Sequence, residues 1–147
     1  MAADSTNILP SARAVVAGRG PIAVAFAVAL ERAGCVVSLV GATRTAFAGL
    51  PAGSRARLTI GDAADPALLL RAGADLAQVL VAVGEPDERN VAVALVAHRL
   101  LGTRIAAAGV GTSVHAAACG PLGIEAVLAS EAEASAFPAR VGALLRP

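Results

Sequence analysis

The segment Ala14–Ala23 constrains the fold more than any other part of this chain. Four apolar residues lead into Gly18-Arg19-Gly20-Pro21-Ile22-Ala23, and an apolar helical pattern follows at once. A Gly-x-Gly-x-x-Ala pattern between a strand and a helix is typical of a turn that binds the pyrophosphate of a dinucleotide. Gly18 permits the tight turn, Gly20 lets the backbone approach a phosphate, and Ala23 lets the helix pack closely on the strand. Free amides and the helix dipole both favour an anion at this helix end.

Strand and helix patterns alternate along the whole chain. The expected strands are Ala14–Ala17, Cys35–Val40, Arg57–Ile60, Gln78–Val83, Arg104–Ala108 and Ile124–Leu128. The expected helices are Pro21–Ala33, Thr45–Leu50, Pro66–Ala72, Asp87–Leu101, Thr112–Cys119 and Glu131–Leu145. Nearly continuous apolar strands that alternate with helices indicate a parallel sheet covered on both faces. With the glycine turn, they predict an α/β, doubly wound Rossmann fold whose six parallel strands have the order 3-2-1-4-5-6.

The length of 147 residues is that of a single domain. We expect residues 1–12 to be a loose lead-in, residues 13–130 to form the nucleotide-binding domain, and residues 131–147 to add a C-terminal helix. The centre of the helix Asp87–Leu101 is apolar all round. Such a helix is usually buried on both sides, so one side is expected on the sheet and the other against a second subunit of a homo-oligomer.

Composition favours a cytoplasmic protein. Hydrophobic residues make up 56% of the chain, but the longest apolar run, Pro21–Leu30, is about half of the roughly 20 residues that span a bilayer. We therefore expect no direct membrane insertion. Met1–Asn7 has no basic residue, so no signal peptide is predicted. Cys35 and Cys119 are then most simply reduced thiols.

Several residue types are missing, and their absence excludes classes of function. The chain has no Lys, Tyr or Trp, which excludes a P-loop lysine, a Schiff-base lysine and the Tyr/Lys pair of short-chain dehydrogenases. A net charge of +1 with arginines scattered from Arg13 to Arg146 predicts no nucleic-acid partner.

Further motifs follow the expected third and fourth strands and accompany the sixth. They are Gly61-Asp62-Ala63-Ala64-Asp65-Pro66, Val83-Gly84-Glu85-Pro86-Asp87-Glu88-Arg89-Asn90, and Leu122-Gly123-Ile124-Glu125-Ala126-Val127-Leu128. With the glycine turn, this ordered set resembles the TrkA-N (RCK/KTN) nucleotide-binding domain of potassium channel and transporter regulators. The resemblance extends from about Arg13 to Ser130.

The resemblance implies a regulatory domain rather than an enzyme. Members of the family bind NAD(H), ADP or ATP, form dimers or rings, and couple the nucleotide to a potassium channel or transporter membrane subunit. It thus implies a cytoplasmic location, peripheral to the inner membrane through that partner. By position, Asp62 would lie near the adenine edge and Asn90 would line the cleft. The candidate binding residues are Gly18, Arg19, Gly20, Pro21, Ile22, Ala23, Gly41, Thr43, Arg44, Asp62, Ala63, Val83, Gly84 and Asn90.

Two positions depart from the family pattern. Gly41 ends the second strand where the family usually has an acid that binds ribose hydroxyls. A missing acid with a nearby arginine can accommodate a 2′-phosphate, so Arg44 with Thr43 raises NADP(H) as a ligand; alternatively, Arg44 is a solvated loop charge. Pro21 removes an amide that a phosphate would use, and a hydrogen bond to a charged group is worth roughly 1.5–3 kcal/mol. Arg19 is the candidate to compensate, and weak binding is expected.

The remaining polar residues predict neither catalysis nor a metal site. In the sequence, His98 and His115 have no ligand-spaced Cys, His or carboxylate beside them. Asp65 is expected to cap the helix that Pro66 begins, which leaves Asp62 as the ligand candidate. Cys119, Ser113 and Ser130 lack a partner base. Two alternatives stay open: a small NAD(P)-dependent oxidoreductase, and a degenerate module kept for oligomerisation.

Overall fold

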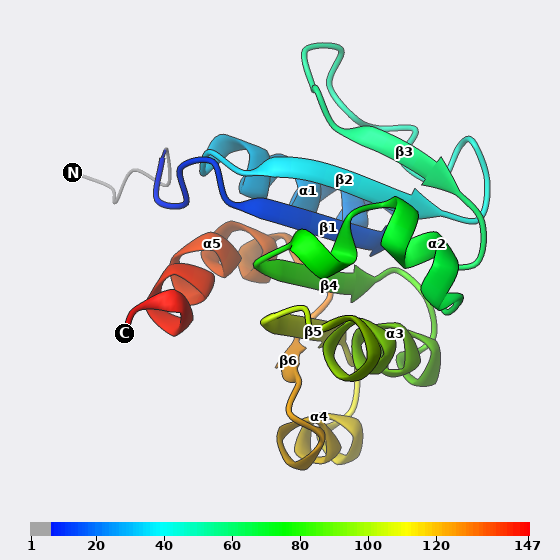
Figure 1. Ribbon diagram of the computed structural model, residues 1–147, viewed down its shortest axis with the longest axis vertical. Coiled ribbons are helices and arrows are strands. Elements are labelled where there is room, and N and C mark those ends of the chain that lie inside the picture. Colours follow the sequence, from blue (N-terminus) through cyan, green and yellow to red (C-terminus); the bar gives the residue numbers. More distant parts are fainter. Residues whose placement is uncertain (1–6) are drawn as a thin grey trace.

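Six parallel strands form one sheet in the order β3-β2-β1-β4-β5-β6 (Figure 1). The computed structural model describes residues 7–147. The strands are β1 Arg13–Gly18, β2 Val36–Gly41, β3 Arg57–Ile60, β4 Val79–Val83, β5 Ile105–Gly109 and β6 Glu125–Val127. The predicted fold class and strand order are confirmed. The order reverses between β1 and β4, and this switch point is where open α/β sheets bind ligands.

Helices cover both faces of the sheet (Figure 1). One face carries α1 Gly20–Arg32 and α5 Glu131–Leu145. The other carries α2 Pro66–Arg71 and α3 Asp87–Leu95, and α3 continues into a π-helical turn, η2 Val96–Leu100. Beyond α3, α4 Ser113–Cys119 contacts β6. Short 3₁₀ turns, η1 Ala74–Leu76 and η3 Gly120–Leu122, follow α2 and α4. Within residues 7–147, none of these helices is both long and apolar enough to cross a membrane.

Strand alternation sorts the apolar side chains into two main cores. In β1, Val16 points to the α1/α5 face, whereas Val15 points to the α2/α3 face. On the first face, Phe26 of α1 and Phe137 of α5 are buried and meet edge to face, with ring centroids 5.3 Å apart. Residues on both faces of β1 and β4 are therefore buried from solvent, as expected for the centre of a parallel sheet.

The expected helix Thr45–Leu50 is wrong. The segment forms consecutive turns, with amide-to-carbonyl bonds of the i→i+3 type: Ala46 to Thr43 at 3.2 Å, Ala48 to Thr45 at 3.1 Å and Leu50 to Phe47 at 3.1 Å. Gly49 lies inside the segment and Pro51 follows it directly, and both residue types disfavour a continuing helix. The turns instead bury Ala46 and Phe47 against the core.

The lead-in predicted for residues 1–12 lies partly outside the described residues, which begin at Asn7. From there the chain runs along the end of α1, where the Leu9 amide donates to the Ala33 carbonyl at 2.8 Å. Leu9 is buried in the α1/α5 core. The burial of Leu9 thus packs this part of the segment against the α1/α5 core. The division of the chain at residues 12 and 130 stays a prediction.

Candidate functional site

A cleft opens at the carboxyl ends of β1, β2 and β3, beside the turn that follows β4. It is narrow: the space between its walls and mouth is about 310 Å³, of which only about 20 Å³ can take the centre of a water molecule. Small residues form most of its walls, and two charged side chains, Glu85 and Arg89, face it. The lining residues are Ala17, Gly18, Val40, Gly41, Ala42, Gly61, Ala63, Ala82, Glu85, Arg89, Asn90 and Val93. We call this cleft the slot.

A second hollow lies on the other side of the β1–α1 turn. It is lined by Arg19, Gly20, Pro21, Val24, Thr43, Thr45, Ala46, Ala48 and Gly49. The predicted site residues are therefore divided. Gly18, Gly41, Ala63 and Asn90 line the slot, and Arg19, Gly20, Pro21 and Thr43 line the second hollow.

The other six predicted residues line neither space. Arg44 is exposed in the loop after β2, and Asp62 is exposed at the mouth of the slot. The Val83 side chain and Ala23 are buried in the core, Ile22 is half-buried in α1, and Gly84 is an exposed turn residue. Val83 and Gly84 instead shape the site through their backbones.

The two central turns touch backbone to backbone. Gly18 has φ +136°, and a Cβ there would lie 1.6 Å from the Val83 carbonyl oxygen. Gly84 has φ +93°, and a Cβ there would lie 1.9 Å from the Arg19 carbonyl oxygen. Glycine is required at both positions because the approach leaves no room for a side chain and the φ angles disfavour one.

The first turn of α1 offers fewer amides than the glycine pattern suggests. The Arg19 amide donates to the Val83 carbonyl at 3.3 Å, and the Gly20 amide donates to the Ala46 carbonyl at 3.0 Å. Pro21 has no amide, so the next backbone donor is that of Ile22. The Arg19 side chain is 67% exposed and lies 3.9 Å from Glu85. Arg19 thus faces a carboxylate rather than filling the place that Pro21 leaves.

Packing explains the glycine that ends β2. Gly41 is buried, and a Cβ there would lie 2.5 Å from the Ala46 Cβ. The turns after β2 occupy the space that an acidic side chain would need. Thr43 pairs with Thr45 through their hydroxyls at 3.3 Å.

The residues after β3 are held by local hydrogen bonds. Asp62 Oδ1 accepts from the Ala64 amide at 2.9 Å and forms an ion pair with Arg89 of α3. The Ala64 amide first, and the Arg89 guanidinium second, lower the pKa of Asp62. Asp65 caps α2 by accepting from the Ala67 amide at 3.0 Å, as expected.

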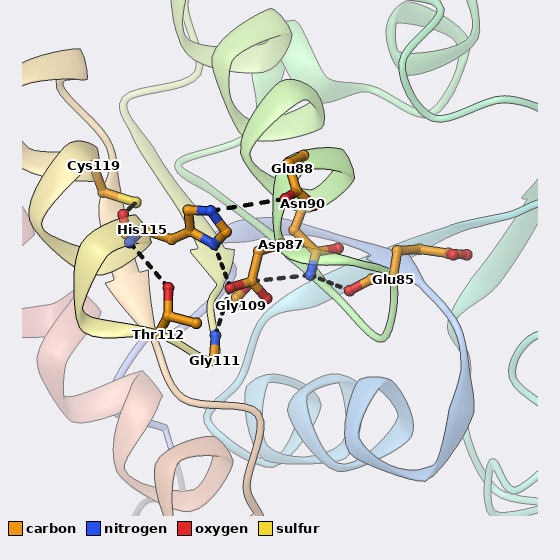
Figure 2. A network of polar contacts seen from close by, with 9 residues as sticks. All are labelled: Glu85, Asp87, Glu88, Asn90, Gly109, Gly111, Thr112, His115 and Cys119. Atoms are coloured by element: carbon orange, nitrogen blue, oxygen red, sulfur yellow. Dashed lines mark hydrogen bonds and ion pairs between the residues drawn. The ribbon is translucent and has the colours of Figure 1, made fainter.

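Asn90 joins the turns after β4 and β5. It is 3% exposed, and its Nδ2 donates to the Glu85 carbonyl at 2.8 Å and to the Gly109 carbonyl at 3.0 Å (Figure 2). Both amide hydrogens are used, so the side chain fixes the start of α3 beside the slot.

A polar network next to Asn90 was not predicted from the sequence (Figure 2). His115 of α4 has two carboxylates beside it: its Nδ1 lies 2.7 Å from Asp87 Oδ2 and its Nε2 lies 3.7 Å from Glu88. Asp87 Oδ2 also accepts from the Gly111 amide at 2.8 Å. The predicted strand order could have indicated this contact. Because β4 and β5 are neighbours, the helices that follow them, α3 and α4, start at the same edge of the sheet. Residues 7–147 hold no group of three side chains suited to a metal ion.

The same network opposes a reactive thiol. The Cys119 Sγ contacts the His115 carbonyl rather than its imidazole, at 3.3 Å. Burial raises the pKa of Cys119, and burial raises that of Cys35 to about 11. Neither buried thiol is placed to act as a nucleophile.

The His115–Asp87 pair predicts a defined pH dependence of stability. The hydrogen bond that the His115 imidazole donates to Asp87 raises the pKa of His115 above its ordinary 6.5, and it lowers the pKa of Asp87. The pair's contribution should be lost as pH rises through the raised His115 pKa, and again as pH falls through the lowered Asp87 pKa. The difference in unfolding free energy between wild type and His115→Gln, measured from about pH 4 to pH 9, checks the alkaline side of this window, where the contribution of the pair should disappear. A His115 pKa at or below 6.5 by NMR titration would contradict it.

Comparison with known proteins decides the family. The family model described as the TrkA-N domain matches residues 14–130. The chain belongs to the TrkA-N domain family. A comparison with curated proteins found no match.

Solved structures share the fold of this TrkA-N domain. GsuK bound to ADP superposes with a TM-score of 0.65 and 18% identity, over 82% of this chain and 32% of that one. The AMP-bound Kef CTD of Shewanella denitrificans gives 0.64 and 21%, over 90% and 89%. The TrkA-N domain of the inner membrane protein ybaL from Escherichia coli gives 0.66 and 15%, over 92% and 98%. The chain spans about a third of the GsuK chain.

Proposed function

We propose that this TrkA-N domain binds an adenine nucleotide in the slot and the adjoining hollow. It would thereby regulate a potassium channel or transporter, without catalysing a reaction itself. The observation that carries the proposal is the convergence of Gly18 at the end of β1, Asp62 after β3 and Asn90 of α3 along the carboxyl edge of the sheet. Two neighbours support the ligand class, since GsuK is bound to ADP and the Kef CTD to AMP.

The phosphate contacts proposed for this site are few. Pro21 lacks an amide, the Gly20 amide is used by Ala46, and Arg19 faces Glu85. Each charged hydrogen bond that is missing costs about 1.5–3 kcal/mol of binding free energy. We therefore expect weaker binding than a complete glycine turn would give. The proposed site residues otherwise remain those of the sequence analysis.

Thermal unfolding with AMP, ADP, ATP, NAD, NADH, NADP and NADPH tests the proposal. A ligand at about 100 times its dissociation constant should stabilise the domain by about 2.7 kcal/mol. Ala42→Leu, at an exposed position that lines the slot, should abolish the shift without changing the melting temperature of the free protein. Ala52→Leu, exposed in the loop before β3, is the matched control. No shift with any nucleotide would instead support a module kept for oligomerisation.

The same series separates NAD from NADP. If Arg44 holds a 2′-phosphate, NADP and NADPH should give the larger shifts, and Arg44→Ala should remove the difference. Equal responses would reject that role. Oxidation of NADPH by small carbonyl compounds, followed as a loss of NADPH absorbance, would contradict a regulatory domain and support the oxidoreductase alternative.

The cellular role proposed follows from the family. A homo-oligomeric, cytoplasmic domain would reach the inner membrane through its channel or transporter partner. The exposed apolar residue Leu100, at the end of η2, is compatible with an additional subunit contact.

A further inference from the structure

Among residues 7–147, Arg89 is the one cation that lines the slot. It extends from α3 toward the turn after β3, where its guanidinium pairs with Asp62. The residues on either side of Asp62, Gly61 and Ala63, are themselves slot residues. The Arg89–Asp62 pair therefore bridges the two sides of the slot at its mouth.

The residues that line the slot include no aromatic side chain on which a nucleotide base could stack. The chain has no Tyr or Trp. Its three phenylalanines, Phe26, Phe47 and Phe137, are buried in the core and do not line the slot. The guanidinium of Arg89 is thus the one large planar cationic group available there, and guanidinium groups stack on aromatic rings.

The start of α3 fixes the backbone of Arg89 and leaves its side chain free to move. Its neighbour Asn90 is buried and bonded to the Glu85 and Gly109 carbonyls. Asp62 is kept ionised by the Ala64 amide and the guanidinium itself, which lower its pKa. Both partners of the pair are substantially exposed, at 43% and 60% of their side chains. An exposed ion pair is weak, so the guanidinium can adjust to a ligand at little cost.

We propose that Arg89 is a specificity-determining residue of the nucleotide site: its guanidinium, oriented by Asp62, stacks on the purine ring of a nucleotide bound in the slot. This rests on the proposed function and deepens it by naming a purine nucleotide as the ligand class. Asp62 acts as a positioning residue for Arg89.

The test compares ligands with and without a base. The dissociation constants of AMP and ribose 5-phosphate are measured by NMR titration, which quantifies weak binding. Arg89→Ala should weaken AMP binding by about 2- to 30-fold, the range of a cation–π contact. Arg89→Lys should weaken it by a smaller factor, because an ammonium keeps the cation–π attraction but cannot stack as a plane. Both variants should leave ribose 5-phosphate binding unchanged. The lysine variant keeps the positive charge but lacks the planar guanidinium group. Asp62→Asn should weaken AMP less, and Arg71→Ala, on the exposed end of α2, should change neither ligand.

Other outcomes overturn the inference. Equal losses for AMP and ribose 5-phosphate would make Arg89 a phosphate ligand. Unchanged AMP binding in both Arg89 variants would leave it a surface ion pair only. AMP binding that Arg89→Lys fully retains would show that charge, not stacking, matters. If wild-type protein binds no nucleotide, the proposed function fails and this inference fails with it; binding with no Arg89 dependence overturns the inference alone.

Discussion

Replacing Gly18 with alanine should destabilise the protein by about 2–6 kcal/mol, the sum of backbone strain and overpacking. The new Cβ would lie 1.6 Å from the Val83 carbonyl oxygen, at a φ of +136°. Val83 belongs to the buried central strand β4, so that carbonyl cannot move without displacing the sheet. Urea denaturation of wild type and Gly18→Ala measures the loss of unfolding free energy.

Gly20→Ala is the matched control in the same turn. Gly20 also has a positive φ, +89°, but a Cβ there meets nothing within 4 Å. The cost should then be backbone strain alone, about 1–2 kcal/mol. Equal destabilisation by the two variants would show that the close approach of β1 to the turn after β4 is not the reason why glycine is required at position 18.

Truncating Phe26 should cost about 3–5 kcal/mol, because it leaves a cavity at the contact of α1 with α5. Phe26 is fully buried and packs edge to face on Phe137. Phe26→Leu, which keeps most of the volume, should lose much less. The measurement is again the unfolding free energy in urea. A loss below about 1 kcal/mol for Phe26→Ala would mean that the site collapses around the smaller side chain.

A double-mutant cycle separates the ring contact from simple burial. Aromatic pairs contribute about 0.5–1.5 kcal/mol beyond their buried area. The loss of unfolding free energy in the double mutant Phe26→Ala/Phe137→Ala should therefore be smaller than the sum of the two single losses by that amount. Additive losses would show that each ring contributes only its own burial.

Much of the fold followed from local pattern. The strand β1 and its glycine turn were predicted because apolar runs, glycines and small residues act over a few neighbours in sequence. The segment Thr45–Leu50 was wrong for the converse reason: its structure depends on burying Ala46 and Phe47, a tertiary contact that its helical composition does not show.

The candidate site was predictable in position but not in detail. Gly18, Gly41, Ala63 and Asn90 meet in the slot because strand ends converge at one edge of a parallel sheet. The separation of Arg19 and Pro21 into a second hollow was not foreseen. Side-chain partners across elements, such as Arg89 with Asp62, depend on distances that the sequence does not contain.

The sequence by itself determined that this chain folds as a doubly wound sheet with a glycine turn at its switch point, since both properties arise from residue order and local sterics. Only the tertiary structure decided what that turn still offers to a ligand. Ala46 takes the Gly20 amide and fills the space beside Gly41, Glu85 faces Arg19, and Arg89 reaches Asp62 across the slot. The physical reason is that hydrogen bonds and charges act over a few ångströms, between residues that only folding brings together.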